Sequence, residues 1–113
     1  MRIQVKARSG VTIDDDLRSR VEKKLEKVAR QVSALAELEI ELREERNRAI
    51  RESQVAEATL HLKGVTLRSR KASTDMWHSI SQVADDLGRQ VKKHRDKRRA
   101  RREAHKVAQQ PAA

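Results

Sequence analysis

The sequence predicts an α+β fold, in which a four-stranded sheet carries two helices on one face in the order β-α-β-β-β-α. Three observations lead to this prediction. Four short segments alternate apolar and polar residues, as strands with one buried face do. Two longer segments repeat apolar residues every three or four positions, which is typical of amphipathic helices. The second of these continues into a basic stretch, so we expect a long basic C-terminal helix.

The first strand and the first helix are predicted near the start of the chain. Residues 2–7 alternate apolar and polar side chains, and Gly10 ends this pattern. A helix is then expected from about 14 to about 32, with either Thr12 or Asp14 as its N-cap. Its buried side is predicted to consist of Leu17, Val21, Leu25, Val28 and Val32.

Three further strands are predicted over residues 37–43, 54–62 and 65–71, each with one apolar and one polar face. The segment 44–53 between the first two is too polar to bury, so we expect an exposed connection there. Lys63-Gly64 predicts a tight turn between the last two strands.

The last helix is predicted to begin after Ser73 or Thr74, either of which could cap it. Its buried side then stops while the helical composition continues into basic residues. We therefore expect a domain over residues 1–99 and a basic, partly disordered tail over residues 100–113. The predicted buried side consists of Met76, Ile80, Val83, Leu87 and Val91.

Charge is concentrated at the C-terminal end of the chain. The net charge of the 113 residues is +10. Residues 88–113 contain ten Lys or Arg and two Asp or Glu, whereas residues 1–87 contain seventeen and fifteen. So dense a basic block indicates a polyanionic partner. A chain without cysteine, without a signal-peptide pattern and without a long apolar run is expected in the cytoplasm, with no membrane partner.

No pattern typical of an enzyme is present, so we predict no catalytic residue, no metal site, no cofactor and no small-molecule substrate. The four histidines have no ligand-like spacing. Consecutive acidic residues at 14–16 suit a helix start better than a metal site, because their side chains diverge. Trp77 is the one aromatic residue, and it suits core packing better than base stacking, which uses several aromatic residues.

Basic residues recur at helical spacing on both predicted helices. Arg89, Lys93 and Lys97 are four residues apart, and Lys92 and Arg99 widen this basic face. On the first helix, Lys24 and Lys27 are neighbours in space. If the two helices lie side by side, these cations form one surface, which suits a structured RNA recognised by its shape and phosphates.

Three segments in order resemble the ribosome hibernation promoting factor family, also called ribosome-associated inhibitors, in its short form. They are ATLHLKG at 58–64, STDMWHSI at 73–80 and LGRQVKKHRDK at 87–97. The resemblance extends over about residues 1–99 and implies the β-α-β-β-β-α fold. The chain departs from it at Trp77, where the family usually has tyrosine.

The resemblance implies a partner and a function. Members bind the small ribosomal subunit and its rRNA in the channel of mRNA and tRNA, with which they compete. They keep idle ribosomes inactive during stress or stationary phase, by occlusion and without catalysis. It also leads us to expect a monomer away from the ribosome. The predicted rRNA-binding residues are Arg18, Lys24, Lys27, Arg89, Lys92, Lys93, Arg95, Lys97 and Arg99.

Two other kinds of binding protein fit part of the pattern. A generic double-stranded RNA-binding module has a related element order, but its basic residues are at a helix start, whereas here they are at a helix end. A protein-interaction module could present the basic segment to an acidic partner.

Overall fold

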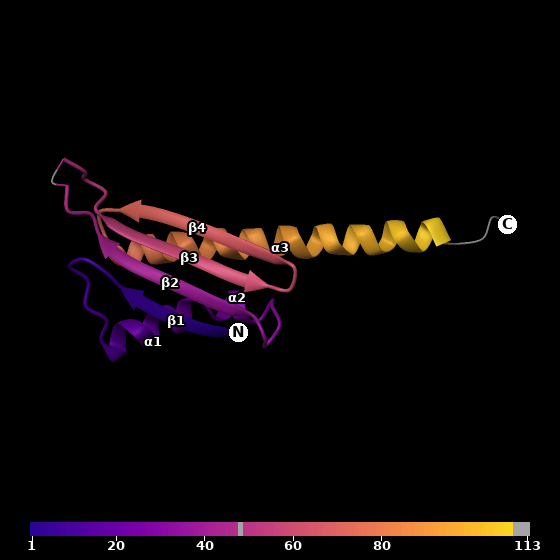
Figure 1. Ribbon diagram of the computed structural model, residues 1–113, viewed down its shortest axis with the longest axis horizontal. Helices are drawn as coiled ribbons and strands as arrows, with labels where there is room; N and C mark the ends of the chain where they lie inside the picture. Colours follow the sequence, from indigo (N-terminus) through magenta and orange to yellow (C-terminus); the bar gives the residue numbers. More distant parts are fainter. Residues whose placement is uncertain (48, 110–113) are drawn as a thin grey trace.

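The computed structural model describes residues 1–47 and 49–109, and their side chains as far as Lys106. Seven elements follow one another along the chain, and Figure 1 shows their arrangement. They are β1 (Arg2–Ala7), α1 (Asp15–Lys24), α2 (Glu26–Ala29), β2 (Glu37–Glu44), β3 (Gln54–Leu62), β4 (Val65–Ser73) and α3 (Met76–Gln109).

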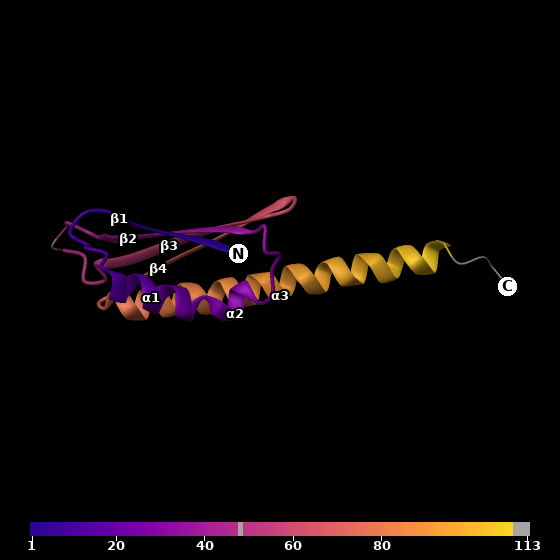
Figure 2. The same ribbon diagram turned by 90° about the horizontal axis from the view of Figure 1, so that it is seen from below.

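The four strands form one sheet in the order β1-β2-β3-β4. β1 pairs with β2 in parallel, so α1 and α2 form the crossover between them, whereas the other pairs are antiparallel. All helices lie on one face of this sheet, with α1 and α2 beside α3 (Figure 2). This arrangement confirms the predicted α+β fold.

The core lies between the sheet and the helices. Leu38, Ile40 and Leu42 of β2 are buried, whereas Glu37 and Glu39, which alternate with them, are exposed on the open face. The same alternation continues across the sheet, since Leu38 is opposite Leu60 of β3. The helices contribute the other half of this core, chiefly with Val21, Leu25, Val28, Ile80, Val83, Leu87 and Val91.

The first helical segment begins as predicted but ends earlier. Asp14 is the N-cap, and its Oδ1 accepts a hydrogen bond from the Leu17 N–H at 2.7 Å. α1 and α2 are separated by one irregular residue, Leu25, which is buried. α2 ends at Ala29 because the chain tightens there: the Gln31 N–H donates to the Val28 carbonyl, three residues back. The expected end at residue 32 was therefore wrong.

The start of α3 also differs from the prediction. Asp75 is the N-cap, since its Oδ2 accepts from the His78 N–H at 3.0 Å. Ser73 lies in β4 and is not the N-cap; its Oγ donates to the Asp75 carbonyl at 2.7 Å and is 2.6 Å from Oγ of Ser79. Ser79 Oγ also donates to the Gln54 carbonyl at 2.7 Å, which joins the start of α3 to β3.

α3 has two parts, which we call the docked half (residues 76–91) and the arm (residues 92–109). Helix geometry gives these 34 residues a length of about 51 Å. The docked half packs under β3 and β4, and the arm projects beyond the sheet (Figures 1 and 2). α3 continues across residue 99 without a break. Residues 110–113 of the predicted tail lie outside the described residues.

Candidate nucleic-acid interface

All nine predicted RNA-binding residues lie on the helices. Eight of them are exposed and Lys24 is half-buried. Arg89 lies 3.8 Å from a carboxylate oxygen of Asp86. Among the described side chains, none of the other eight has a carboxylate within 4 Å. The other eight cations are therefore free to meet an external anion.

A contact between α1 and α3 determines which side of α1 joins the basic surface. The Arg20 guanidinium carbon lies 4.4 Å from the centroid of the Trp77 ring, a cation–π arrangement. Lys24 is one turn further on the same side of α1, so it also faces α3. Arg18 is two residues from Arg20, which turns it to the opposite side of the helix. The structure thus brings Lys24 toward α3 and leaves Arg18 apart.

The six predicted RNA-binding cations of α3 divide between two flanks of the helix. Arg95 and Arg99 lie on the side that faces the loop after α2, because they line a groove with Gln31 and Ser33. Lys92 precedes Arg95 by three residues and belongs to the same side. We call these three residues the inner flank and the other three, Arg89, Lys93 and Lys97, the outer flank.

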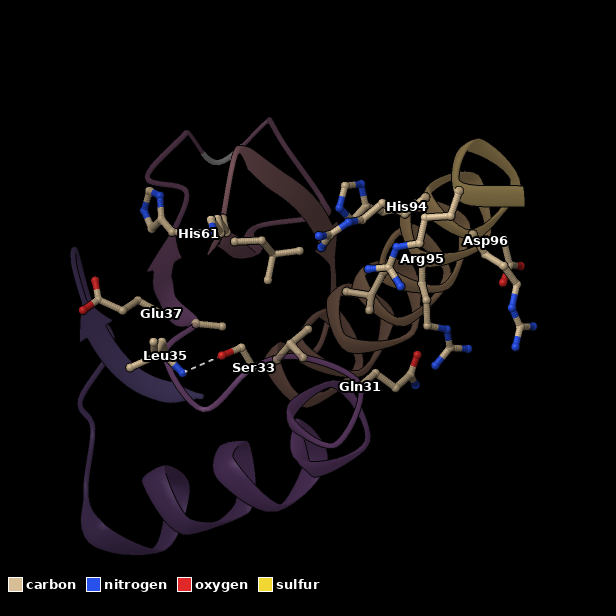
Figure 3. A pocket seen from close by; sticks show the side chains of 16 residues that line it. Gln31, Ser33, Leu35, Glu37, His61, His94, Arg95 and Asp96 are labelled. Atoms are coloured by element: carbon tan, nitrogen blue, oxygen red, sulfur yellow. Dashed lines mark hydrogen bonds between the residues drawn. The ribbon is translucent and has the colours of Figure 1, made fainter. Parts of the chain in front are cut away.

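The groove lies at the point where the arm begins to extend beyond the sheet. It is bounded by the loop 31–36, the β3–β4 turn and the arm, and its volume is about 1020 Å³. In Figure 3, Ser33 and Leu35 lie on the loop, across the groove from His94 and Arg95 on α3. Two further arginines of the arm, Arg98 and Arg102, line this groove together with Arg95 and Arg99.

Arg98 and Arg102 were missed by the sequence prediction, although a signal for them is present. From Leu87 the spacing of the buried stripe continues through Val91 to residues 95, 98 and 102, in steps of four, four, three and four. The stripe changes from apolar residues to arginine where the sheet ends. Arginines that continue the spacing of the buried residues therefore indicate a side of the helix that points toward the rest of the domain but is not covered by it.

Asp86 shows how the docked half holds its own charges. Its Oδ2 accepts a hydrogen bond from Nε2 of Gln90 at 3.0 Å, and the same Nε2 donates to the Arg68 carbonyl at 2.8 Å. The pKa of Asp86 is lowered chiefly by the Ser69 hydroxyl. Burial opposes this effect, and Gln90, Lys71 and Arg89 add smaller effects that lower the pKa further. The Ser69 hydroxyl is buried and has no well-aligned hydrogen bond, so its interaction with Asp86 is a loose one.

The described residues carry no sign of a metal site or a membrane segment. No group of three or more potential ligands gathers among residues 1–47 and 49–109. Over the same residues, no helix combines the length and the apolar character needed to cross a membrane.

Comparison with known proteins identifies relatives over most of the chain. Residues 3–99 match the model of the family described as sigma 54 modulation protein / S30EA ribosomal protein. A ribosome hibernation promoting factor of Azotobacter vinelandii is 30% identical over 105 residues, which cover 91% of this chain and 94% of the relative. A ribosome hibernation promotion factor of Picosynechococcus is 27% identical over 90 residues, or 79% of this chain. The chain spans about half of that second relative, since the match covers 47% of it.

Solved structures share the fold. The N-terminal domain of Protein Y from Thermus thermophilus superposes with a TM-score of 0.71 at 26% identity, over 83% of this chain and 99% of that one. A ribosomal subunit interface protein from Coxiella burnetii superposes with a TM-score of 0.69 at 24% identity, over 85% of this chain and 99% of that one, and shows the fold alone. The family predicted from the three sequence segments is confirmed: the chain belongs to the sigma 54 modulation protein / S30EA ribosomal protein family.

Proposed function

We propose that this protein is a ribosome hibernation factor, which binds the small ribosomal subunit in the channel of mRNA and tRNA. There it inhibits translation during stress or stationary phase. One observation carries this proposal: the family match over residues 3–99 contains all nine predicted RNA-binding cations, and eight of them have no carboxylate within 4 Å among the described side chains. The names of the two hibernation factors that the chain resembles support the same function.

In this mechanism the protein acts by occupying the channel, and no chemical step is needed. Lysine and arginine side chains on the helices neutralise rRNA phosphates and release counterions, which supplies affinity without reading base sequence. The inner flank and Lys24 offer one row of cations, and the outer flank offers another. A protein held in this way excludes mRNA and tRNA by volume, so it needs neither a cofactor nor a catalytic residue. The ribosome places this activity in the cytoplasm.

Sedimentation with purified components tests the choice of partner. The protein is mixed with intact ribosomes, isolated subunits or a generic RNA duplex at about 0.1 M salt, where phosphate contacts are still strong. We expect stoichiometric co-migration with the small subunit and with intact ribosomes, and little with duplex RNA. Equal binding to every duplex would instead identify a double-stranded RNA-binding module.

Competition tests the place of binding. We expect mRNA together with initiator tRNA to release the protein from the small subunit, since all three occupy the same channel in this proposal. Release should depend on both RNAs being bound in the channel, so a tRNA that does not bind the small subunit serves as the control. A protein that stays bound while the channel is filled would contradict occlusion.

A further inference from the structure

The groove at the base of the arm has two chemically different surfaces. One wall is cationic and consists of Arg95, Arg98, Arg99 and Arg102. None of these four has a carboxylate within 4 Å among the described side chains, although Asp96 lies on the same stretch of helix. Figure 3 shows Asp96 turned away from the loop that carries Ser33 and Leu35. This wall therefore presents positive charge to whatever enters the groove.

The floor of the groove is apolar. We give this name to the apolar residues of the lining, Val32, Leu35, Ala36, Leu62 and Val91; Ala36 and Val91 are buried, so the accessible apolar surface comes from the other three. Leu35 is 90% exposed, the most exposed large apolar side chain among the described residues.

A short turn holds Leu35 in this exposed position. The Leu35 N–H donates to Oγ of Ser33 at 3.1 Å, and the Ala36 N–H donates to the Ser33 carbonyl at 3.0 Å. These hydrogen bonds hold the backbone at Leu35, whose side chain lines the groove and contributes little to the core.

We propose that this groove binds an unpaired nucleotide of RNA, with the base against the apolar floor and the neighbouring phosphates on the arginine wall. The proposal rests on the proposed function, because it names the part of the RNA that one region of the interface would recognise. The volume of the groove, about 1020 Å³, is close to the upper end of the range for clefts that bind small organic groups, about 300–1,000 Å³, so it has room for a nucleotide. Arginine planes also stack on splayed-out bases, so the wall can contact the base as well as the phosphates.

Charge and apolarity together favour this occupant over two others. A regular duplex presents phosphates and keeps its base rings stacked inside, so it would leave the apolar floor exposed to water. A second copy of this chain carries the same net charge of +10, so like-charge repulsion opposes its approach to the arginine wall. An unpaired nucleotide supplies a flat apolar ring and two anionic groups in one ligand.

Binding of short RNA probes tests the proposal directly. Fluorescence anisotropy compares a single-stranded RNA hexamer with a backbone of the same length that lacks bases, and with a duplex of equal total charge. We expect the hexamer to bind at least threefold more tightly than the abasic backbone, because only the hexamer can cover the floor. Equal affinity for the hexamer and the abasic backbone would overturn the proposal.

Two matched pairs of variants separate the floor from the wall. Leu35→Ser should weaken binding of the hexamer about three- to tenfold and leave the abasic backbone unaffected. Ile50→Ser is its control, since Ile50 is also exposed, at 42%, but lies in the β2–β3 connection at the other end of the sheet. Arg98→Gln with Arg102→Gln should reduce the preference for bases. Arg101→Gln with Lys106→Gln removes equal charge from two exposed residues that do not line the groove, and it should preserve the preference.

The result separates this proposal from the proposed function. If Leu35→Ser and Ile50→Ser bind all probes equally, the groove takes no base, and co-sedimentation with the small subunit still decides whether the protein binds ribosomes. An acidic peptide is also tested as a competitor against unlabelled hexamer. If the peptide displaces the bound hexamer at a lower concentration than unlabelled hexamer does, the groove prefers a protein partner and the proposal is overturned. Chemical shifts of the Leu35 and Leu62 methyl groups provide a second readout, and they should move on titration with the hexamer.

Discussion

The docked half and the arm belong to one helix, but different interactions keep them helical. In the docked half, Ile80, Val83 and Leu87 are fully buried against the sheet. In the arm, the described side chains are exposed except His94, which is half-buried, and nine basic residues face two acidic ones. Packing stabilises the first part, whereas the second depends on helix propensity and is opposed by like-charge repulsion. The comparison teaches that one helical spacing serves burial in one part and display of charge in the other.

If this division is correct, the largest effect on stability comes from the docked half. Leu87→Ala removes a fully buried side chain and should lower the free energy of unfolding by about 2–5 kcal/mol, because it leaves a cavity. Lys97→Ala, ten residues further on, changes an exposed side chain and should alter stability by less than about 0.5 kcal/mol. Thermal unfolding followed by circular dichroism measures both. A similar loss in the two variants would mean that the arm is packed against the body.

The next largest effect concerns binding and divides the flanks of α3. Lys93→Glu with Lys97→Glu should weaken ribosome binding roughly tenfold to a hundredfold and reduce the slope of log affinity against log salt by about 1.4–1.8, or two phosphate contacts. Melting temperature should stay nearly constant, since both side chains are exposed. Arg95→Glu with Arg99→Glu is the matched change on the inner flank. Whichever pair has the larger effect identifies the flank that lies closer to the phosphates.

A smaller effect is expected for the charge network of the docked half. The Ser69 hydroxyl, followed by Gln90 and the cations Lys71 and Arg89, lowers the pKa of Asp86. A carboxylate with a lowered pKa in the folded state contributes stability above the pKa of the unfolded chain, about 3.9, and this contribution disappears as the pH falls through the folded pKa. Asp86→Asn should therefore reduce stability at pH 7 and flatten its decline below about pH 4. Urea unfolding at pH 7 and pH 3 measures this difference.

The smallest effect concerns the contact between α1 and the docked half. Replacing Arg20 with methionine keeps the aliphatic stem but removes the cation over Trp77, so stability should fall by about 0.5–1 kcal/mol. Trp77 is the one aromatic residue of the chain, so its fluorescence reports this contact without interference. An unchanged emission spectrum in the variant would show that the guanidinium does not occupy the ring face in solution.

The strands and the helical stripes could be predicted because burial leaves a periodic trace. Alternation along β2 and β3 placed both strands to within about one residue, whereas β4 runs two residues beyond its predicted end because Ala72 and Ser73 continue pairing without an apolar signal. Capping was less predictable. Several residues near the start of α3 could cap it, and the sequence does not distinguish Asp75, which caps the helix, from Ser73, whose hydroxyl contacts Ser79.

The candidate site was predictable in its residue types and helices, and less so in its geometry. Spacing predicts which cations share a side of one helix, but it does not show which side of α1 meets α3. The Arg20–Trp77 contact decides this, and it separates Arg18 from the others. The groove depends on a loop, a turn and a helix far apart in the chain, so local pattern could not reveal it. The roles of the nine residues in binding rRNA stay predictions.

The sheet has two free edges, β1 and β4, and each is a potential template for another strand. Gln90 covers part of the β4 edge, because its Nε2 donates to the Arg68 carbonyl. Arg68 and Arg70 on β4, and Arg2 and Lys6 on β1, are exposed cations on these outer strands. Two copies that approach edge to edge would therefore bring like charges together. The basic character of this protein thus also protects it from strand-by-strand aggregation at high concentration.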